Sequence, residues 1–129
     1  MSQERAVVIL GASDQDNRYS YRAQLLLTEH GFRVVPVHPS LESVEGIPVV
    51  HDLADVDPEP DVLTIYVRPE TSSELAEKIL MLRPHAVIFN PGTENPELES
   101  RLSDAETRVV RACTIVLLTT GRFGEIIGI

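Results

Sequence analysis

"AVVILGASDQDNRYSY", residues 6–21, is the stretch that decides the fold. Its run of apolar residues is typical of a buried strand, and Gly11 follows at the place where an α/β protein turns from its first strand into its first helix. Phosphate-binding turns are built at that place. This turn has one glycine where a dinucleotide-binding loop has three, and Asp14 and Asp16 add charges that repel phosphate. Its ligand therefore has to be inferred from the rest of the chain.

Composition narrows the classes of protein to consider. A chain of 129 residues, 43% hydrophobic and 24% charged, predicts a single domain over residues 1–129. The net charge of −9 argues against nucleic acid or an anionic membrane as partner, and an anionic small ligand would need a local positive site. No apolar run reaches the roughly 20 residues of a membrane span, and the N-terminal stretch lacks the layout of a signal peptide. We therefore expect a cytoplasmic, acidic protein.

A single cysteine, Cys113, is present. It excludes an internal disulfide and any thiolate metal cluster within one chain, so no metal site is predicted.

Apolar runs alternate with helical periodicity along the chain. We expect strands at residues 6–10, 33–37, 61–67, 85–90 and 107–112, a short extended piece at 46–50, and helices at 21–30, 71–82 and 96–104. Gly31 is expected to end the first helix, and Ser72 or Ser73 to cap the start of the second. Strands that alternate with helices through short connections indicate parallel pairing. The predicted fold is α/β, a doubly wound Rossmann-like domain with a mainly parallel five-stranded sheet.

In such a sheet the ligand crevice lies at the carboxyl ends of the strands, beside the point where the strand order reverses. The positions expected there are Gly11 to Ser13, Val37 to Pro39, Val67 to Pro69, Asn90 to Gly92, and Ala112 with Cys113. In the first turn, small residues let backbone N–H groups approach an anion and Ser13 adds a hydroxyl. Ser20 can cap the following helix, while Arg18 and Arg22 can offset the two aspartates.

A nicotinamide dinucleotide fits this turn poorly. The second and third glycines of the dinucleotide fingerprint correspond to Ser13 and Asp16, and the acid that would bond the ribose is missing from "VHPS" at 37–40. A kinase-type phosphate loop is excluded, since no Gly-Lys-Ser or Gly-Lys-Thr occurs. The sequence also lacks a Gly-x-Ser-x-Gly elbow and a His-Glu-x-x-His motif, so we predict no catalytic residues.

Four features resemble the CoA-binding domain family: "GASDQDNRYSYR" at 11–22, "VVPVHP" at 34–39, "YVRPE" at 66–70, and the late Cys113. The family contains stand-alone Rossmann-type proteins similar to the nucleotide-binding module of the succinyl-CoA synthetase alpha subunit. The resemblance implies that the first turn holds the phosphates of coenzyme A or an acyl-CoA, and that the second and third strand ends border the adenosine. The ligand-binding residues implied are Gly11, Ala12, Ser13, Arg18, Ser20, Tyr21, Pro36, Val37, His38, Pro39, Val67, Arg68, Pro69, Asn90, Gly92 and Cys113.

Two segments depart from the family pattern. His38 stands where family members usually carry Asn, and "FNPGTEN" at 89–95 replaces an aromatic-x-Gln-x-Gly segment. We therefore expect the phosphate end of the site to follow the family more closely than the thiol end. Cys113 lies either at the crevice rim near the ligand thiol or in the core as a small buried residue.

Two other functions remain open. One is a small NAD(P)- or other nucleotide-binding enzyme, which needs an acid near the ribose. The other is a regulatory or interaction protein with a vestigial crevice. Its apolar stretch 114–129 would then contact a second copy or a protein partner, whereas in a simple binding module this stretch packs on its own domain.

Overall fold

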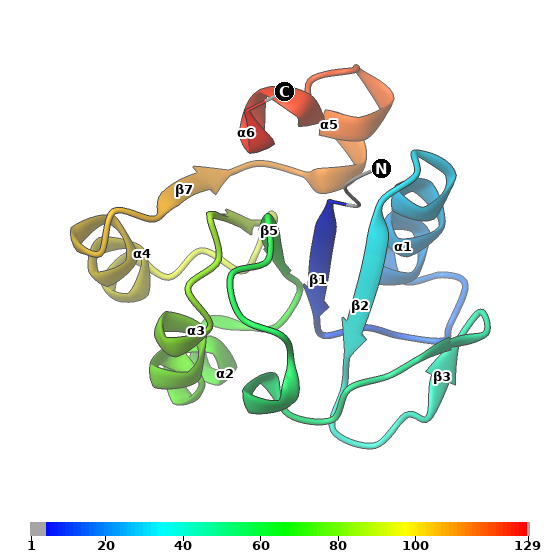
Figure 1. Cartoon of the computed structure of the whole chain (residues 1–129), viewed down its shortest axis with the longest axis horizontal. Coiled ribbons are helices and arrows are strands. Elements are labelled where there is room, and N and C mark those ends of the chain that lie inside the picture. Colours follow the sequence, from blue (N-terminus) through cyan, green and yellow to red (C-terminus); the bar gives the residue numbers. More distant parts are fainter. Residues whose placement is uncertain (1–4, 129) are drawn as a thin grey trace.

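A five-stranded parallel sheet forms the centre of the computed structural model, which describes residues 5–128 (Figure 1). Its strands are β1 (Ala6–Leu10), β2 (Arg33–Val37), β5 (Val62–Ile65), β6 (Ala86–Phe89) and β7 (Arg108–Arg111), in the order β2-β1-β5-β6-β7. Every neighbouring pair in this sheet is parallel. A separate two-stranded hairpin consists of β3 (Ser43–Val44) and β4 (Ile47–Pro48). The predicted α/β class with a parallel five-stranded sheet is confirmed.

Helices cover both faces of the sheet. One face carries α1 (Tyr19–Glu29), α5 (Thr114–Thr119) and α6 (Phe123–Ile127); the other carries the short 3₁₀ helix η1 (Leu53–Asp55), α2 (Pro69–Glu74), α3 (Ala76–Leu82) and α4 (Pro96–Asp104). In Figure 1, α2, α3 and α4 lie to the left of the sheet, α1 to the right, and α5 and α6 across the top. Side chains of β1 alternate between the two cores, Val7 and Ile9 packing on one and Val8 and Leu10 on the other.

The order of the strands places the site. The chain passes from β1 to β2 on one side and returns to β5 on the other side of β1, so the strand order reverses between β1 and β5. The loops that leave β1 and β5 must diverge at this point, which opens a crevice at the carboxyl edge of the sheet.

The apolar C-terminal stretch packs on its own domain. Leu117, Leu118 and Phe123 are buried in the core that α1 shares with the sheet. The Phe123 ring meets the Phe32 ring edge to face, with centroids 5.2 Å apart. Of the two placements expected for this stretch, the intramolecular one holds.

Two predicted helix starts are wrong. Helix α1 begins at Tyr19, with Arg18 in an extended conformation at the N-cap, so Ser20 lies inside the first turn and does not cap it. Helix α2 begins at Pro69, because the fixed φ of proline suits a first helical position, and Ser72 and Ser73 therefore lie within it. The expected helix 71–82 is in fact two short helices that meet at Leu75.

The predicted end of α1 is confirmed. Gly31 follows the helix with a φ of +87°, a value that glycine adopts without strain. The N–H of Gly31 bonds the Thr28 carbonyl and the N–H of Phe32 bonds the Leu27 carbonyl, which is the Schellman arrangement.

Candidate functional site

Two adjoining cavities lie at the carboxyl ends of the strands. The larger, about 660 Å³, lies between the β1–α1 loop and the segments that follow β5 and β6. The smaller, about 260 Å³, lies between the end of β2, residues 51–53 and the helices α2 and α3. Gly11 and His38 line both cavities. These two residues therefore lie between the cavities.

Gly11 lies where the β1–α1 loop passes close to the segment that follows β5. Its φ is +94°, and a Cβ atom there would lie 2.9 Å from Val67 Cγ1 and 3.1 Å from the carbonyl atoms of Tyr66. Both the backbone conformation and the close approach of the β5 end require glycine. The glycine that follows β1 is therefore needed for packing where the strand order reverses, between β1 and β5, whatever ligand the turn binds.

The first N–H groups of the turn are not directed at an anion. Those of Gly11 and Ala12 both donate to the Val37 carbonyl, at 3.1 and 3.0 Å, which ties the turn to the end of β2. The N–H groups of Gly11 and Ala12 are thus used within the fold. Ser13 also lines the larger cavity; its Oγ accepts from the N–H of Gln15 at 3.0 Å, and its hydroxyl hydrogen remains available.

The N-terminus of α1 opens onto the larger cavity, through Arg18, Tyr19 and Ser20. The first turn of a helix carries partial positive charge on N–H groups that have no partner within the helix. Arg18 is exposed and has no ion-pair partner among residues 5–128. The guanidinium of Arg22, in contrast, lies 5.8 Å from the centre of the Tyr19 ring. A cationic side chain and a helix N-terminus thus meet at one wall of this cavity.

His38 fixes the turn after β2. Its Nδ1 accepts hydrogen bonds from the backbone N–H groups of Ser40 (3.0 Å) and Leu41 (3.1 Å). Accepting at Nδ1 assigns the ring hydrogen to Nε2 and leaves that nitrogen as a donor. An asparagine side-chain oxygen makes the same kind of bond to the N–H two residues on. This explains how histidine serves where the family usually has asparagine.

The smaller cavity has apolar walls and a polar rim. Leu10, Val37, Leu53, Val67 and Leu75 contribute the walls. At the rim, Lys78 Nζ lies 2.9 Å from Asp52 Oδ2. The backbone N–H of Ala54 and the Lys78 ammonium lower the pKa of Asp52, which keeps this carboxylate charged.

Asn90 is used inside the fold. Its Nδ2 donates to Thr64 Oγ1 (2.7 Å) and to the Ile65 carbonyl (2.9 Å), and its Oδ1 accepts from the N–H of Thr114 (2.9 Å). The side chain is buried and ties β5 and β6 to the start of α5. The neighbouring Pro91 and Thr93 line the larger cavity in its place.

Tyr66 is a lining residue that sequence reasoning missed. It contributes to the larger cavity, and its hydroxyl is buried without a hydrogen-bond partner among the described residues. Burial raises the pKa of Tyr66 to about 12. The sequence predicts a strand that extends to Val67, but β5 ends at Ile65. Tyr66 is therefore the first residue after the strand, and it belongs to the segment that lines the crevice.

The predicted ligand-binding residues divide into two groups. Those that line the cavities are Gly11, Ala12, Ser13, Arg18, Ser20, Val37, His38, Pro39 and Val67. Those that do not are Tyr21, Pro36, Arg68, Pro69, Asn90, Gly92 and Cys113.

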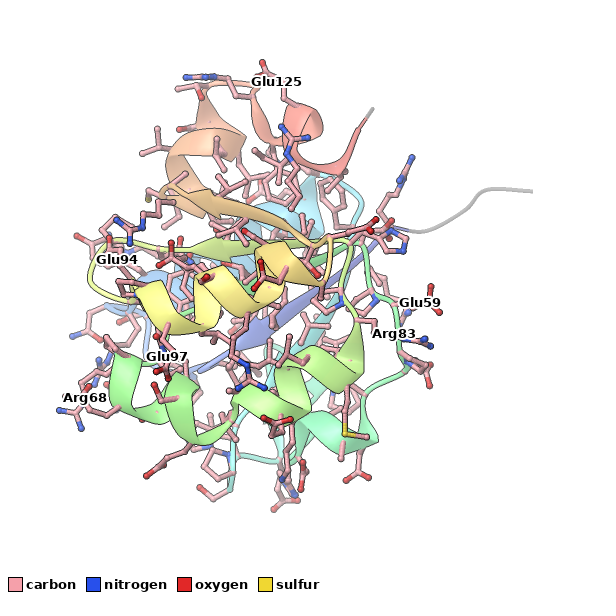
Figure 2. All side chains as sticks on the ribbon, turned by 90° about the vertical axis from the view of Figure 1, so that its left-hand side faces the viewer. Glu59, Arg68, Arg83, Glu94, Glu97 and Glu125 are labelled. Carbon is pink, nitrogen blue, oxygen red and sulfur yellow. The ribbon has the colours of Figure 1, made fainter. Side chains whose placement is uncertain are left out.

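Separate observations place the members of the second group. The Tyr21 hydroxyl donates to Glu45 Oε2 at 2.7 Å and so contacts the β3–β4 hairpin. Arg68 is exposed, and Figure 2 shows its side chain extending away from the body of the protein. Cys113 is half-buried at the N-cap of α5. Pro36 is buried within β2, and the N–H of Gly92 bonds Glu94 Oε1 at 3.0 Å.

Metal and membrane sites are not indicated in the described part of the chain. No three His, Cys, Asp or Glu side chains among residues 5–128 are grouped so that they could hold a metal ion. None of the described helices is long and apolar enough to cross a bilayer.

Known proteins resemble the chain over nearly its full length. Residues 5–119 match the family described as "CoA binding domain". A crystal structure of an uncharacterized protein is 37% identical, with a TM-score of 0.86, covering 95% of this chain and all of that one (100%). The structure of cell-free ID.343 from Thermus thermophilus is 29% identical, with a TM-score of 0.85 and coverage of 93% and 91%. The uncharacterized protein YneT of Bacillus subtilis (strain 168) is 22% identical over 110 residues, 85% of this chain and 82% of its own.

Proposed function

The chain belongs to the CoA-binding domain family, and from this we propose that it binds coenzyme A or an acyl-CoA across the two cavities. The observation that carries the proposal is that the α1 N-terminus and Arg18, which has no ion-pair partner among residues 5–128, lie beside Gly11, where the strand order reverses. The family resemblance drawn from the sequence motifs is confirmed, and the ligand is our inference from it.

The pyrophosphate of the ligand is assigned to the larger cavity. Ser13 and Ser20 supply hydroxyl donors, Arg18 supplies charge, and the first turn of α1 supplies backbone N–H groups. Anions are stabilised at helix N-termini, and a guanidinium adds charge-assisted hydrogen bonds to phosphate oxygens.

The adenine is assigned to the smaller cavity, between the walls of Val37 and Val67. Binding pockets for such groups are mostly apolar and carry a few polar groups that fix orientation. The ribose then lies between the cavities, beside Gly11 and His38, which line both. The Nε2–H of His38 is the donor offered at that junction.

The pantetheine arm is assigned to the remainder of the larger cavity, past Tyr66 and Thr93. Cys113 lies outside the lining, so the ligand thiol has to extend beyond this cavity to meet it.

The proposal is one of binding without catalysis. Serine catalysis needs a neighbouring base, and Ser13 Oγ instead accepts from a backbone N–H while His38 Nδ1 is taken by the backbone.

Calorimetric titration of the purified protein with CoA tests the proposal. CoA is expected to bind with a stoichiometry of one, and NAD more weakly, because the segment at the end of β2, residues 37–40, carries no acid to bond its ribose. Arg18→Ala should weaken CoA binding by roughly tenfold or more, since a charge-assisted contact contributes about 1.5–3 kcal/mol.

The matched control is Arg122→Ala, which removes an exposed arginine at the start of α6, outside both cavities. Equal affinities for CoA and NAD, or no binding of either, would exclude the proposed function. Equal losses in the two variants would remove Arg18 from the site.

A further inference from the structure

The charges that line the two cavities are mostly negative. Arg18 and Asp14 belong to the larger cavity, and Lys78, Asp52 and Glu74 to the smaller. Two cations thus face three carboxylates along a path proposed to hold a polyanion. The site offers less positive charge than the full phosphate complement of coenzyme A requires.

Lys78 is already paired with a carboxylate. Its ammonium is held 2.9 Å from Asp52 Oδ2, and the other oxygen of Asp52 accepts from the N–H of Ala54 at 2.9 Å. The pair joins α3 to the N-cap of η1. Glu74 lines the same cavity and has no ion-pair partner within the described chain. The rim of the smaller cavity therefore presents a net negative charge.

Other groups near the path do not change this balance. His38 accepts backbone hydrogen bonds at Nδ1, so its Nε2 offers one N–H donor. His51 Nε2 donates to the Leu41 carbonyl at 2.8 Å. Arg68 lines neither cavity and points away from the body of the protein (Figure 2). Arg18 and the α1 N-terminus are the positive groups in the lining of the larger cavity, and a pyrophosphate uses them.

We propose that the site selects an adenosine 5′-diphosphate moiety without a 3′-phosphate, so that 3′-dephospho-CoA or its acyl form is the preferred ligand. This rests on the proposed function, because it uses the same two cavities. CoA and dephospho-CoA share base, pyrophosphate and pantetheine arm, and differ by a monoester phosphate of about −1.5 to −2 charges. That phosphate is carried by the ribose, beside a rim where Asp52 already neutralises the one lysine and Glu74 is unpaired.

The test is a parallel calorimetric titration with CoA and with 3′-dephospho-CoA at low salt. Dephospho-CoA is expected to bind more tightly by a factor on the order of three to five, because the extra phosphate of CoA is repelled by the carboxylate of Glu74 through a water-like dielectric. The difference should shrink at high salt because the charges are screened.

Asp52→Asn is the decisive variant. Asparagine caps a helix as well as aspartate does, so η1 keeps its cap while Lys78 is released. CoA affinity should then rise relative to dephospho-CoA, and the preference should shrink or reverse. The matched control is Glu77→Gln, on the same helix α3, which frees Arg101 of α4 from an ion pair outside both cavities.

Each outcome decides a separate point. Tighter binding of CoA than of dephospho-CoA overturns the inference and leaves the proposed function intact. If Arg68→Ala abolishes such a preference, Arg68 is the missing phosphate ligand. An Asp52→Asn ratio equal to that of wild type also overturns the inference, because Lys78 would then have no part in selection. Binding of neither compound overturns the proposed function itself.

Discussion

At the scale of single residues, His38 shows how one side chain can replace another of different shape. Its Nδ1 accepts the N–H groups of Ser40 and Leu41, as an asparagine oxygen does in a turn of this kind. We expect His38→Asn to retain the stability of the protein. His38→Ala should lower the free energy of unfolding by about 1 kcal/mol, since two backbone donors lose their acceptor. Urea unfolding curves measure both, and a loss in His38→Asn as large as that in His38→Ala would contradict this role.

Gly11 is expected to be intolerant of any side chain. Gly11→Ala meets a positive φ and a contact of 2.9 Å with Val67 Cγ1, and should cost on the order of 2–4 kcal/mol. Gly46→Ala is the control, because Gly46 has a φ of +79° and nothing lies within 4 Å of its Cβ position. It should cost only the backbone strain, about 1 kcal/mol. Comparable losses in the two variants would show that the approach of the β5 end is not the constraint.

Tyr66 gives the protein a pH dependence in the alkaline range. Its pKa in the folded state is about 12, above the value of 10.0 expected when unfolded. The neutral phenol is therefore favoured by the fold, and its contribution to stability is complete below pH 10 and lost as the pH rises towards 12.

Unfolding free energies measured at pH 8 and pH 11 test this. Wild type should lose about 1 kcal/mol through Tyr66 at pH 11, and Tyr66→Phe should lack that part of the decrease. Tyr19→Phe, which removes a hydroxyl from a ring that is 67% exposed, is the control. The same alkaline decrease in wild type and Tyr66→Phe would disprove the assignment.

At the scale of elements, the helices and strands differ in how well the sequence predicts them. The strands at residues 6–10 and 33–37 and the helix at 96–104 have the bounds that were expected. The last of these starts after Asn95, whose Oδ1 accepts from the N–H of Leu98, a signal that stands in the sequence itself. Helices α1 and α2 have Arg18 and Arg68 at their N-caps, with no side-chain cap, so a capping serine is the wrong signal for both starts.

Some parts of the cavity lining were predictable from the sequence and others were not. The turn at Gly11 and the end of β2 at Val37 follow from the rule that ligands bind at the carboxyl ends of parallel strands. The sequence does not show that the Val37 carbonyl takes the N–H groups of Gly11 and Ala12, because this depends on how β1 and β2 align across the sheet. Asn90 likewise looked free in the sequence, and its partners Thr64 and Thr114 lie 26 and 24 residues away.

At the scale of the whole molecule, the C-terminal helices complete the domain. Phe123 is 3% exposed and packs against Phe32, so Phe123→Ala should lower the free energy of unfolding by about 3 kcal/mol. Val116→Ala, at a position 53% exposed on α5, should change it by less than about 0.5 kcal/mol.

The oligomeric alternative makes a different prediction for the same measurement. Because Leu117, Leu118 and Phe123 are buried within one chain, the unfolding midpoint should not depend on protein concentration. A midpoint that rises with concentration, and that Val116→Ala lowers, would show that these helices also form an interface between chains.

Ligand binding should stabilise the whole domain, because the two cavities are built from loops that follow β1, β2, β5 and β6 and exist together only in the folded state. A ligand that binds only the native state at a hundred times its Kd adds about 2.7 kcal/mol to the free energy of unfolding. For a chain of this size the melting temperature should rise by roughly 8–11 °C. Differential scanning fluorimetry with CoA, 3′-dephospho-CoA and NAD measures the effect, with Arg18→Ala as the variant in which it is reduced. A vestigial crevice predicts no shift with any of the three, and a nicotinamide site predicts the largest shift with NAD.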